Sequence, residues 1–359
     1  MAGMRTVRNA ASICVTSALA WVGAVNAQGT IALPDNTVEG FNATRFENEY
    51  KLFVPDAQVK PLWDYLNKRY GQGIMLPSQN GVRLTAVFAD EFFTDVYFDT
   101  PSFTLLKMKS AVRHRSREIP GQPQNRKDGR QLMQIKLNMP GEELTRTEVK
   151  FPIKYYEVES QEDKHPVIGI IDRDHRADFS ERVRAAGIDP WSLREALTLI
   201  QRRRRVYLSD SIGAYATVTV DETSSKKFWL ESKFTEVELE LNEIRYSSAD
   251  SAARAYMQLV TDAIKADIMN ALPGIVQDQT PKYNKSYDRL VASSWAGPLL
   301  MRASVVDMKV MGGVGGMIVF ALWVIVMMIR RKRTERRPGP RGVSGERPAR
   351  VRDPVASGR

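Results

Sequence analysis

Acidic side chains recur at every second position in two segments that lie far apart in the chain. The first segment is Glu47-Asn48-Glu49-Tyr50-Lys51, and the second is Glu236-Val237-Glu238-Leu239-Glu240. Alternate side chains of a strand share a face, so each segment would gather its carboxylates on one side. Clustered carboxylates repel one another, and a bound Mg²⁺ or Mn²⁺ removes that penalty because hard oxygen ligands suit these ions. The candidate metal ligands are Glu47, Glu49, Glu236, Glu238 and Glu240.

Basic side chains alternate in the same way in other segments. A triphosphate carries closely spaced negative charges, which Arg forks and Lys ammonium groups are suited to hold. The candidate phosphate ligands are Lys51, Arg113, Arg115, Lys136, Arg146 and Arg204. A metal among the carboxylates would stabilise charge on a transferred phosphoryl group and orient an attacking water. The single cysteine, Cys14, lies in the first 27 residues, which we interpret below as a cleaved signal peptide. We therefore expect no thiol chemistry in the domain that follows.

The elements that must position these residues are strands. Six segments carry a charged face opposite an apolar one, and any one of them alone would describe a half-exposed strand. If the charged faces converge, they form the interior of a closed antiparallel barrel whose apolar outer face needs a cover. We predict helices at Asp56 to Arg69, Pro190 to Ile200 and Ala249 to Ala271, and these would provide that cover. The expected fold is therefore α+β and mainly β.

An alternative for the same acids and bases is a network of internal ion pairs that only holds the barrel together. Buried ion pairs contribute little net stability, and an apolar interior would be simpler. This argument favours a binding site.

Two terminal segments predict export and anchoring. Residues 1–27 have basic residues, an apolar stretch and a small-residue cleavage site, as a signal peptide does. Residues 310–329 contain no charged residue, which suits a membrane-spanning helix. Arg330, Arg331, Lys332 and Arg333 follow directly, and this places the C-terminal end in the cytoplasm. We therefore expect a single-pass protein of the inner or plasma membrane with an extracytoplasmic domain.

The remaining boundaries follow from these segments. We expect a linker at 28–37, the barrel domain at 38–290, a juxtamembrane linker at 291–309 and a basic disordered tail at 330–359. The tail holds eleven Lys and Arg against three Asp and Glu, so most of the net charge of +10 lies there. This location argues against nucleic-acid binding by the domain. Glycines 312, 313, 315 and 316 would allow close packing with another copy, or a flexible approach to the membrane.

The motifs together resemble those of the CYTH or triphosphate tunnel metalloenzyme superfamily, which includes VTC-type polyphosphate polymerase domains. Glu47-Asn48-Glu49-Tyr50-Lys51 is similar to its ExExK signature, and Glu236 to Glu240 resembles its ExExE strand. Further similar segments follow in the family's order: Tyr97-Phe98-Asp99-Thr100, Ala111 to Arg115, Gln134-Ile135-Lys136, Arg146-Thr147-Glu148, Gln201 to Tyr207, Val220-Asp221 and Lys285-Ser286-Tyr287. The order of these segments over about 240 residues carries the resemblance.

The resemblance implies an eight-stranded tunnel that binds a triphosphate or polyphosphate with Mg²⁺ or Mn²⁺. It implies catalytic roles for Glu47, Glu49 and Glu238, adds Lys285 to the phosphate ligands, and gives Glu148 and Asp221 supporting roles. Two departures stand out. Lys150 occupies a place where many members have a Glu, and the run Arg202 to Arg205 leaves open which face points inward, although the spacing to Tyr207 favours Arg204.

The stretch from Tyr155 to Leu199 has no role that the sequence identifies. His165 and His175 lie there beside several Asp residues, which would suit a second metal site, but a solvated loop is the favoured interpretation.

Three functions remain open, and the first is favoured. It is metal-dependent hydrolysis of a triphosphate or inorganic polyphosphate. The second is a binding or sensing module without turnover, which would need the basic residues but not all the acids. The third is a VTC-like polymerase, disfavoured for an extracytoplasmic domain because nucleoside triphosphates are expected to be scarce there.

Overall fold

The computed structural model of the chain describes residues 43–71, 74–75, 83–118, 131–139, 141 and 144–305. The predicted signal peptide, the linker at 28–37, the helix at 310–329 and the basic tail lie outside these residues. Within the described ranges, no helix is both long enough and apolar enough to cross a membrane.

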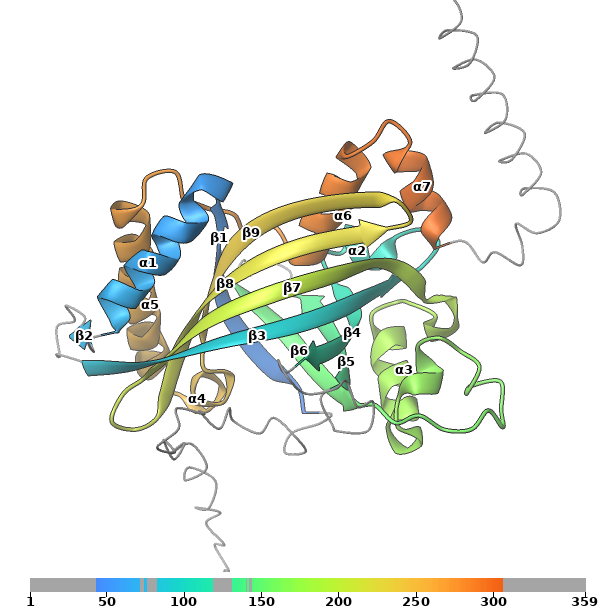
Figure 1. Cartoon of the computed structure of the whole chain (residues 1–359). Helices are drawn as coiled ribbons and strands as arrows, with labels where there is room; N and C mark the ends of the chain where they lie inside the picture. Colours follow the sequence, from blue (N-terminus) through green and yellow to red (C-terminus); the bar gives the residue numbers. More distant parts are fainter. Residues whose placement is uncertain are drawn as a thin grey trace, which may run out of the picture. The chain divides into compact units, whose positions relative to one another are not determined.

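Eight antiparallel strands form a closed barrel (Figure 1). In chain order they are β1 (Arg45–Val54), β3 (Arg83–Asp99), β4 (Ala111–Glu118), β5 (Gln131–Asn138), β6 (Thr145–Pro152), β7 (Arg194–Ser209), β8 (Ala214–Lys227) and β9 (Leu230–Leu241). Around the barrel the order is β1, β6, β5, β4, β3, β7, β8 and β9, and β9 pairs with β1 to close the ring. Two short strands, β2 (Ile74–Met75) and β10 (Val276–Gln277), pair with β3 and β1 at the margin. The predicted closed eight-stranded antiparallel barrel is confirmed.

One side of the barrel is covered by α1 (Val59–Tyr70) and α5 (Ser251–Ala271). These two helices lie together beside β1, β8 and β9 in Figure 1. Leu62 and Leu66 of α1 and Ile264 of α5 belong to one buried apolar cluster with outward side chains of the strands, such as Val220 and Leu239. The helices therefore take up the apolar outer face that the alternation of the strands requires.

A second cover consists of the segment whose role the sequence left unidentified. It contains three short 3₁₀ helices, η2 (Ile168–Ile170), η3 (Arg173–His175) and η4 (Pro190–Ser192), together with α3 (Arg176–Ala185). Phe179 and Val183 of α3 pack with Ile135 of β5 and with Val149 and Phe151 of β6. The segment is therefore a structural cover for the outer faces of β4, β5 and β6.

One end of the barrel is closed by α6 (Lys282–Ala292). Tyr283 of α6 stacks on Tyr97, which points from β3 into the barrel interior, with 5.0 Å between the ring centroids. The next helix, α7 (Gly297–Ser304), lies in the predicted juxtamembrane linker but packs beside α6 through the buried Met301. Three further helices connect strands or precede α5: η1 (Asp56–Gln58), α2 (Thr104–Lys107) and α4 (Glu243–Ser248).

The helices predicted at 56–69 and 249–271 are present, but the helix predicted at Pro190 to Ile200 is wrong. Asp189 caps a single 3₁₀ turn at η4, and β7 then begins at Arg194. Leu193, Leu197 and Leu199 are all buried, and such a spacing suits a buried strand as well as a helix. The segment forms a strand because it pairs with β3 on one side and with β8 on the other. The local sequence does not show this pairing.

Candidate functional site

The inward faces of the strands bring most of the predicted site residues together. Across β1 and β9, Glu49 lies opposite Glu240 and Lys51 opposite Glu238. Across β1 and β6, Glu47 lies opposite Arg146. The same face continues through Lys136 opposite Glu148 and Arg113 opposite Gln134, because directly paired residues share a face. The charged faces therefore converge on one interior.

Two groups of three carboxylates in the described residues lie close enough to hold a metal ion. The first acidic group is Glu47, Glu148 and Glu243, and the second acidic group is Asp221, Glu236 and Glu238. Within each group the closest oxygens of the three side chains lie within 4.8 Å of one another. Hard carboxylate oxygens of this kind fit Mg²⁺ or Mn²⁺.

In the first acidic group, two lysines each reach only part of the set. Lys136 Nζ donates to both oxygens of Glu47 at 2.6 and 2.7 Å and lies 3.6 Å from Glu148. Lys150 Nζ lies 3.1 Å from Glu148 and 3.4 Å from Glu243. Lys150, the departure from the family pattern, is thus an ion-pair partner of this group.

The neighbouring charges shift the pKa values of the carboxylates in and near the first acidic group in different directions. Burial, with the nearby charge of Glu49, raises the pKa of Glu47 to about 7 although Lys136 opposes the shift. Burial and the charge of Glu47 also raise the pKa of Glu240 well above its usual range. Glu148 behaves differently, because Lys150 and Lys136 outweigh its burial and lower its pKa to about 2. Glu47 and Glu240 are therefore the carboxylates whose charge the neighbouring cations offset least.

In the second acidic group, one ammonium contacts all three carboxylates. Lys282 of α6 contacts Asp221, and its Nζ lies 3.1 Å from Glu236 and 3.2 Å from Glu238. Lys282 is 5% exposed, so this cation is held inside the barrel. Although burial opposes ionisation, Lys282 and Lys51 hold the pKa of Glu238 well below its usual range.

Further cations surround this second group. Lys51 Nζ lies 2.6 Å from Glu238 and 2.8 Å from Glu49, and Lys285 Nζ lies 2.9 Å from Glu236. Arg203 donates to Asp221 at 2.8 Å and to Glu238 at 2.7 Å. An internal ion-pair network, which the sequence left open as an alternative, is therefore present at least here.

Guanidinium groups of β4 converge on Asp95 of β3 in the same interior. Arg115 donates to both oxygens of Asp95 at 2.7 Å, and Arg113 donates at 3.1 Å. Asp95 is fully buried, yet these two arginines hold its pKa well below its usual range. Gln201 of β7 donates to the same carboxylate at 2.6 Å.

The inward position on β7 belongs to Arg203, and the expectation that Arg204 points inward is wrong. Arg203 lies opposite Asp221, whereas Arg204 lies opposite Val220 on the outer face. The Arg204 guanidinium pairs with Glu222 at 2.7 Å and lies 4.9 Å from the ring centroid of Trp63 in α1. Four consecutive arginines give both faces the same residue type, so the alternation carried no signal.

Other interior residues were missed by the sequence analysis. They are Glu91, Asp95, Arg203, Glu243 and Lys282. Asp95 had a local signal, because it alternates with Phe93 and Tyr97 in β3. Lys282 precedes Lys285 by three residues, a spacing that places both on one face of a helix. Glu243 had no such signal, because it is brought in by α4, whose first turn follows the Asn242 cap.

The two histidines of the α3 segment do not form a metal site with described residues, since neither acidic group includes one. His165 is buried, so the solvated-loop interpretation is wrong for it. Its Nδ1 accepts hydrogen bonds from the backbone N–H groups of Val167 and Ile168 at 3.3 and 3.2 Å. His165 therefore stabilises a turn of the structural cover.

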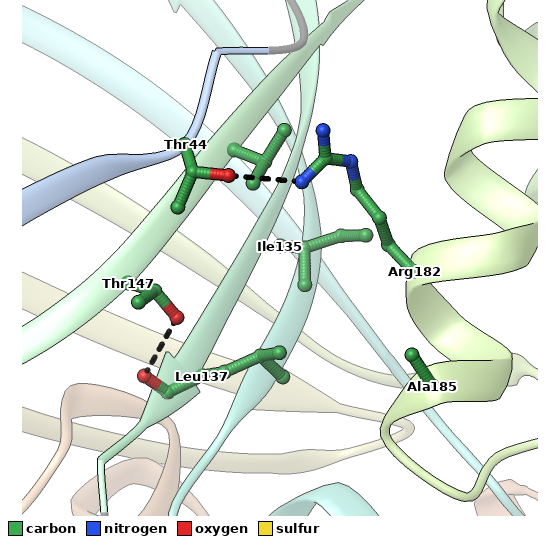
Figure 2. A pocket seen from close by; sticks show the side chains of 7 residues that line it. Thr44, Ile135, Leu137, Thr147, Arg182 and Ala185 are labelled. Carbon is green, nitrogen blue, oxygen red and sulfur yellow. Dashed lines mark hydrogen bonds between the residues drawn. The ribbon is translucent and has the colours of Figure 1, made fainter.

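A cavity of about 220 Å³ lies outside the barrel, between α3 and the outer faces of β5 and β6 (Figure 2). Its lining is Thr44, Ile135, Leu137, Thr147, Val149, Arg182 and Ala185. Arg182 bridges it by donating to the Thr44 hydroxyl at 3.0 Å. None of the charged interior residues lines this cavity, so it is separate from the site.

Comparison with protein families matched the CYTH domain over residues 80–266, which is more than half of the 359 residues. The matched range begins after β1 and ends before α6. A search of curated proteins found no match.

Several solved structures match the chain at low sequence identity. A Pyrococcus horikoshii protein is 15% identical, with 68% of this chain and 98% of that chain covered and a TM-score of 0.38. A Hippeastrum protein studied as an adenylyl cyclase, and described as having a dominant triphosphatase activity, is 15% identical with 67% and 95% covered and a TM-score of 0.36. The S. pombe RNA triphosphatase is 10% identical, with 62% and 82% covered and a TM-score of 0.30.

Proposed function

The chain belongs to the CYTH domain family, and from this membership and the charged interior of its barrel we propose that it is a metal-dependent hydrolase of a triphosphate or inorganic polyphosphate. The observation that carries the proposal is that arginines and acidic groups share the interior of one closed barrel. The guanidinium groups of Arg113 and Arg115 lie there together with Glu47, whose pKa is raised although Lys136 donates to its carboxylate. A phosphate chain and a divalent cation are complementary to these groups.

The chain's own residues have distinct roles in this proposal. Arg113 and Arg115 would exchange part of their bonding to Asp95 for phosphate oxygens, because charge-assisted guanidinium bonds suit phosphate as well as carboxylate. The further phosphate ligands would be Lys51, Lys136, Arg146 and Lys285, which reach the interior from β1, β5, β6 and α6. Because each is a fixed cation before substrate arrives, little reorganisation accompanies binding.

The first acidic group fits the cation better than the second. Glu47, Glu148 and Glu243 offer three hard oxygen ligands, and no single described ammonium group contacts all three. In the second acidic group Lys282 already contacts all three carboxylates. A divalent ion held by the first group would neutralise phosphoryl charge and polarise the bond that breaks. Glu49 and Glu240 lie nearby on β1 and β9 and would add to its negative field.

The test is phosphate release by the purified full-length chain. Tripolyphosphate, ATP and long-chain polyphosphate are supplied in turn with Mg²⁺, Mn²⁺ or a chelator. We expect metal-dependent release from at least one of them, and loss of release in Glu47→Gln. Absence of release from all three, with the protein folded by circular dichroism, would remove the hydrolase proposal.

A binding or sensing module is the second candidate, and the ion pairs of the second acidic group favour it. A module that only captures polyphosphate has no need of exposed metal ligands, and paired acids would keep its interior folded. Binding of tripolyphosphate without turnover in the same assay would support this candidate. A VTC-like polymerase is the third candidate, and chain extension from ATP would identify it.

We also propose that the domain faces outward from a single membrane anchor at residues 310–329, on the charge pattern described above. Protease added to spheroplasts would then digest the domain and spare the basic tail. A protected domain would contradict this topology and would restore the polymerase as a candidate, because nucleoside triphosphates would be accessible.

A further inference from the structure

Arginines line the interior of β4 and β7 beyond the residues needed to hold a triphosphate. Arg113, Arg115 and Arg117 alternate along β4, so all three point inward, and positions 113 and 117 lie about 13 Å apart along the strand. Arg205 joins them from β7, where it shares the inward face with Arg203. We name Arg113, Arg115, Arg117 and Arg205 the arginine track.

The arginine track runs from the closed end of the barrel toward solvent. At the closed end, Arg113 donates to Tyr97, on which Tyr283 of α6 stacks. The exposed fraction of the side chain rises along β4 from 7% at Arg113 to 12% at Arg115 and 18% at Arg117. It rises in the same direction along β7, from 6% at Arg203 to 16% at Arg205. Arg117 and Arg205 are therefore the inward arginines of β4 and β7 that are most accessible to an anion entering from solvent.

Glu91 brings the outer two arginines together. Arg117 of β4 and Arg205 of β7 lie on strands separated by β3, and both pair with the Glu91 carboxylate of that strand. Glu91 is 1% exposed, so the carboxylate lies beneath the guanidinium groups rather than in front of them. Asp95 is shared in the same way by Arg113 and Arg115. Each of these carboxylates therefore serves two guanidinium groups.

An aromatic ring holds the track in place. Phe93 lies between Asp95 and Glu91 on the inward face of β3, and its ring centroid is 4.6 Å from the Arg115 guanidinium carbon and 5.7 Å from that of Arg117. Cation–π contact and the shared carboxylates restrain long side chains that would otherwise lose conformational entropy on binding. The track is thus prepared to bind an extended row of phosphoryl groups.

We propose that Arg117 and Arg205 bind the phosphoryl groups that lie beyond the triphosphate unit, which makes a linear polyphosphate longer than tripolyphosphate the preferred substrate. This inference rests on the proposed function of the interior. A nucleoside attached to a triphosphate would place an uncharged sugar and base against these guanidinium groups. Additional phosphoryl groups would instead form charge-assisted hydrogen bonds with them.

The experiment compares chain lengths in the full-length protein and three variants. Initial rates are measured with tripolyphosphate, ATP and a long-chain polyphosphate, and equilibrium binding of the same compounds is measured by calorimetry. The variants are Arg117→Gln, Arg205→Gln and the matched control Arg202→Gln. Arg202 lies on the same strand as Arg205 but points outward, pairs with Asp90 and is 47% exposed at its side chain.

We expect the wild-type chain to have a higher kcat/KM for long-chain polyphosphate than for tripolyphosphate or ATP. Arg117→Gln and Arg205→Gln should each reduce kcat/KM for the long chain by about tenfold or more, mainly through KM, because a hydrogen bond to a charged group is lost. Tripolyphosphate kinetics should change less than about twofold, as expected for a residue outside its binding unit. Arg202→Gln should change neither. Arg117→Lys, which keeps the charge that faces Glu91, should recover part of the long-chain preference.

Three results would overturn the inference: ATP preferred over polyphosphate, equal losses for short and long chains, or no loss in either variant. Calorimetry keeps the inference testable without turnover. If no phosphate is released but long-chain binding still weakens in Arg117→Gln and Arg205→Gln, the track stands and the hydrolase proposal fails. If tripolyphosphate is hydrolysed but binding shows no dependence on chain length, the hydrolase stands and the track fails.

Discussion

The two acidic groups of the interior each consist of three carboxylates but have different cations. Each has three carboxylates with oxygens within 4.8 Å of one another. The second group surrounds the Lys282 ammonium, while the lysines of the first group each reach only two of its members. Lys282 comes from α6, the helix that closes the barrel, so folding itself delivers the cation to the second group.

This difference shows that a cluster of carboxylates does not by itself identify a metal site. A buried carboxylate must be neutralised, and an ammonium, a guanidinium or a metal ion can each do so. Where one ammonium contacts every carboxylate, as Lys282 does in the second group, the pKa of Glu238 is low and an added cation has less charge to neutralise. In the first group each carboxylate has a protein cation but no described cation reaches all three, so the pKa of Glu47 rises to about 7 and this carboxylate still gains from an added cation.

The largest effect is expected for Glu47→Gln, which acts on the first acidic group. The side chain keeps its shape and loses the charge that would hold the metal, so metal-dependent phosphate release should fall by about two to three orders of magnitude. Folding should survive, because the change removes a buried carboxylate that burial already disfavours. Release rates with Mn²⁺ and the thermal midpoint are the measurements.

The matched control for this change is Glu195→Gln, on the outer surface of β7, where the carboxylate is 51% exposed and pairs with Lys227. It should leave release unaffected. Full activity of Glu47→Gln with Mg²⁺ and Mn²⁺ would show that the first acidic group is not the metal site.

Lys282→Met tests whether the Lys282 ammonium already neutralises the second acidic group and stabilises the fold. Removing the ammonium leaves Asp221, Glu236 and Glu238 short of a buried positive charge, which should cost about 3 to 5 kcal/mol of unfolding free energy. Mn²⁺ should restore part of this loss, because the vacated group then resembles the first one. Urea unfolding with and without Mn²⁺ measures both effects.

Lys285→Met is the companion variant, one helical turn further along α6. Lys285 contacts Glu236 and Asp278 but not the whole group, so its loss should be smaller and should respond less to Mn²⁺. If Mn²⁺ stabilised wild type, Lys282→Met and Lys285→Met equally, Lys282 would not be the resident cation of the second group.

The pH dependence of metal binding provides a third, smaller effect. The pKa of Glu47 in the folded chain, about 7, lies above its ordinary value of 4.5, so the folded chain holds a proton that the unfolded chain has lost between these values. The contribution of Glu47 to the stability of the metal-free protein therefore falls as the pH rises from 4.5 to 7. Metal must displace the same proton, so Mn²⁺ affinity should rise by up to about tenfold per pH unit below 7 and then level off.

Calorimetric titration with Mn²⁺ across this range is the measurement, with proton release read from buffers of different ionisation enthalpy. In Glu47→Gln the pH dependence should largely disappear. A Mn²⁺ affinity that stays constant from about pH 5 to pH 8 in the wild-type chain would contradict the assignment of Glu47 to the metal.

The sequence predicted the barrel because charge and apolarity alternate along each strand, and this pattern is local. Glu47, Lys136 and Glu236 are inward for that reason. The partners of each charge depend on register between strands and on helix docking, which are not local. Lys282 meets Asp221 across 61 positions, and Arg45 meets Glu243 across 198. The distinction between a filled and an unfilled acidic group therefore required the structure.

The smallest effect is expected at Arg204, where sequence reasoning chose the wrong neighbour. Arg203 belongs to the second acidic group, and Arg203→Gln should destabilise the fold by several kcal/mol because Asp221 and Glu238 lose a buried partner. Arg204→Gln removes a pair with Glu222, which is 37% exposed, and a contact with Trp63, so about 1 kcal/mol or less should be lost. Phosphate release should be unchanged in Arg204→Gln once the protein is folded. Urea unfolding and release rates for the two variants check this contrast, and a loss of release specific to Arg204→Gln would mean that the outer face of β7 takes part in function.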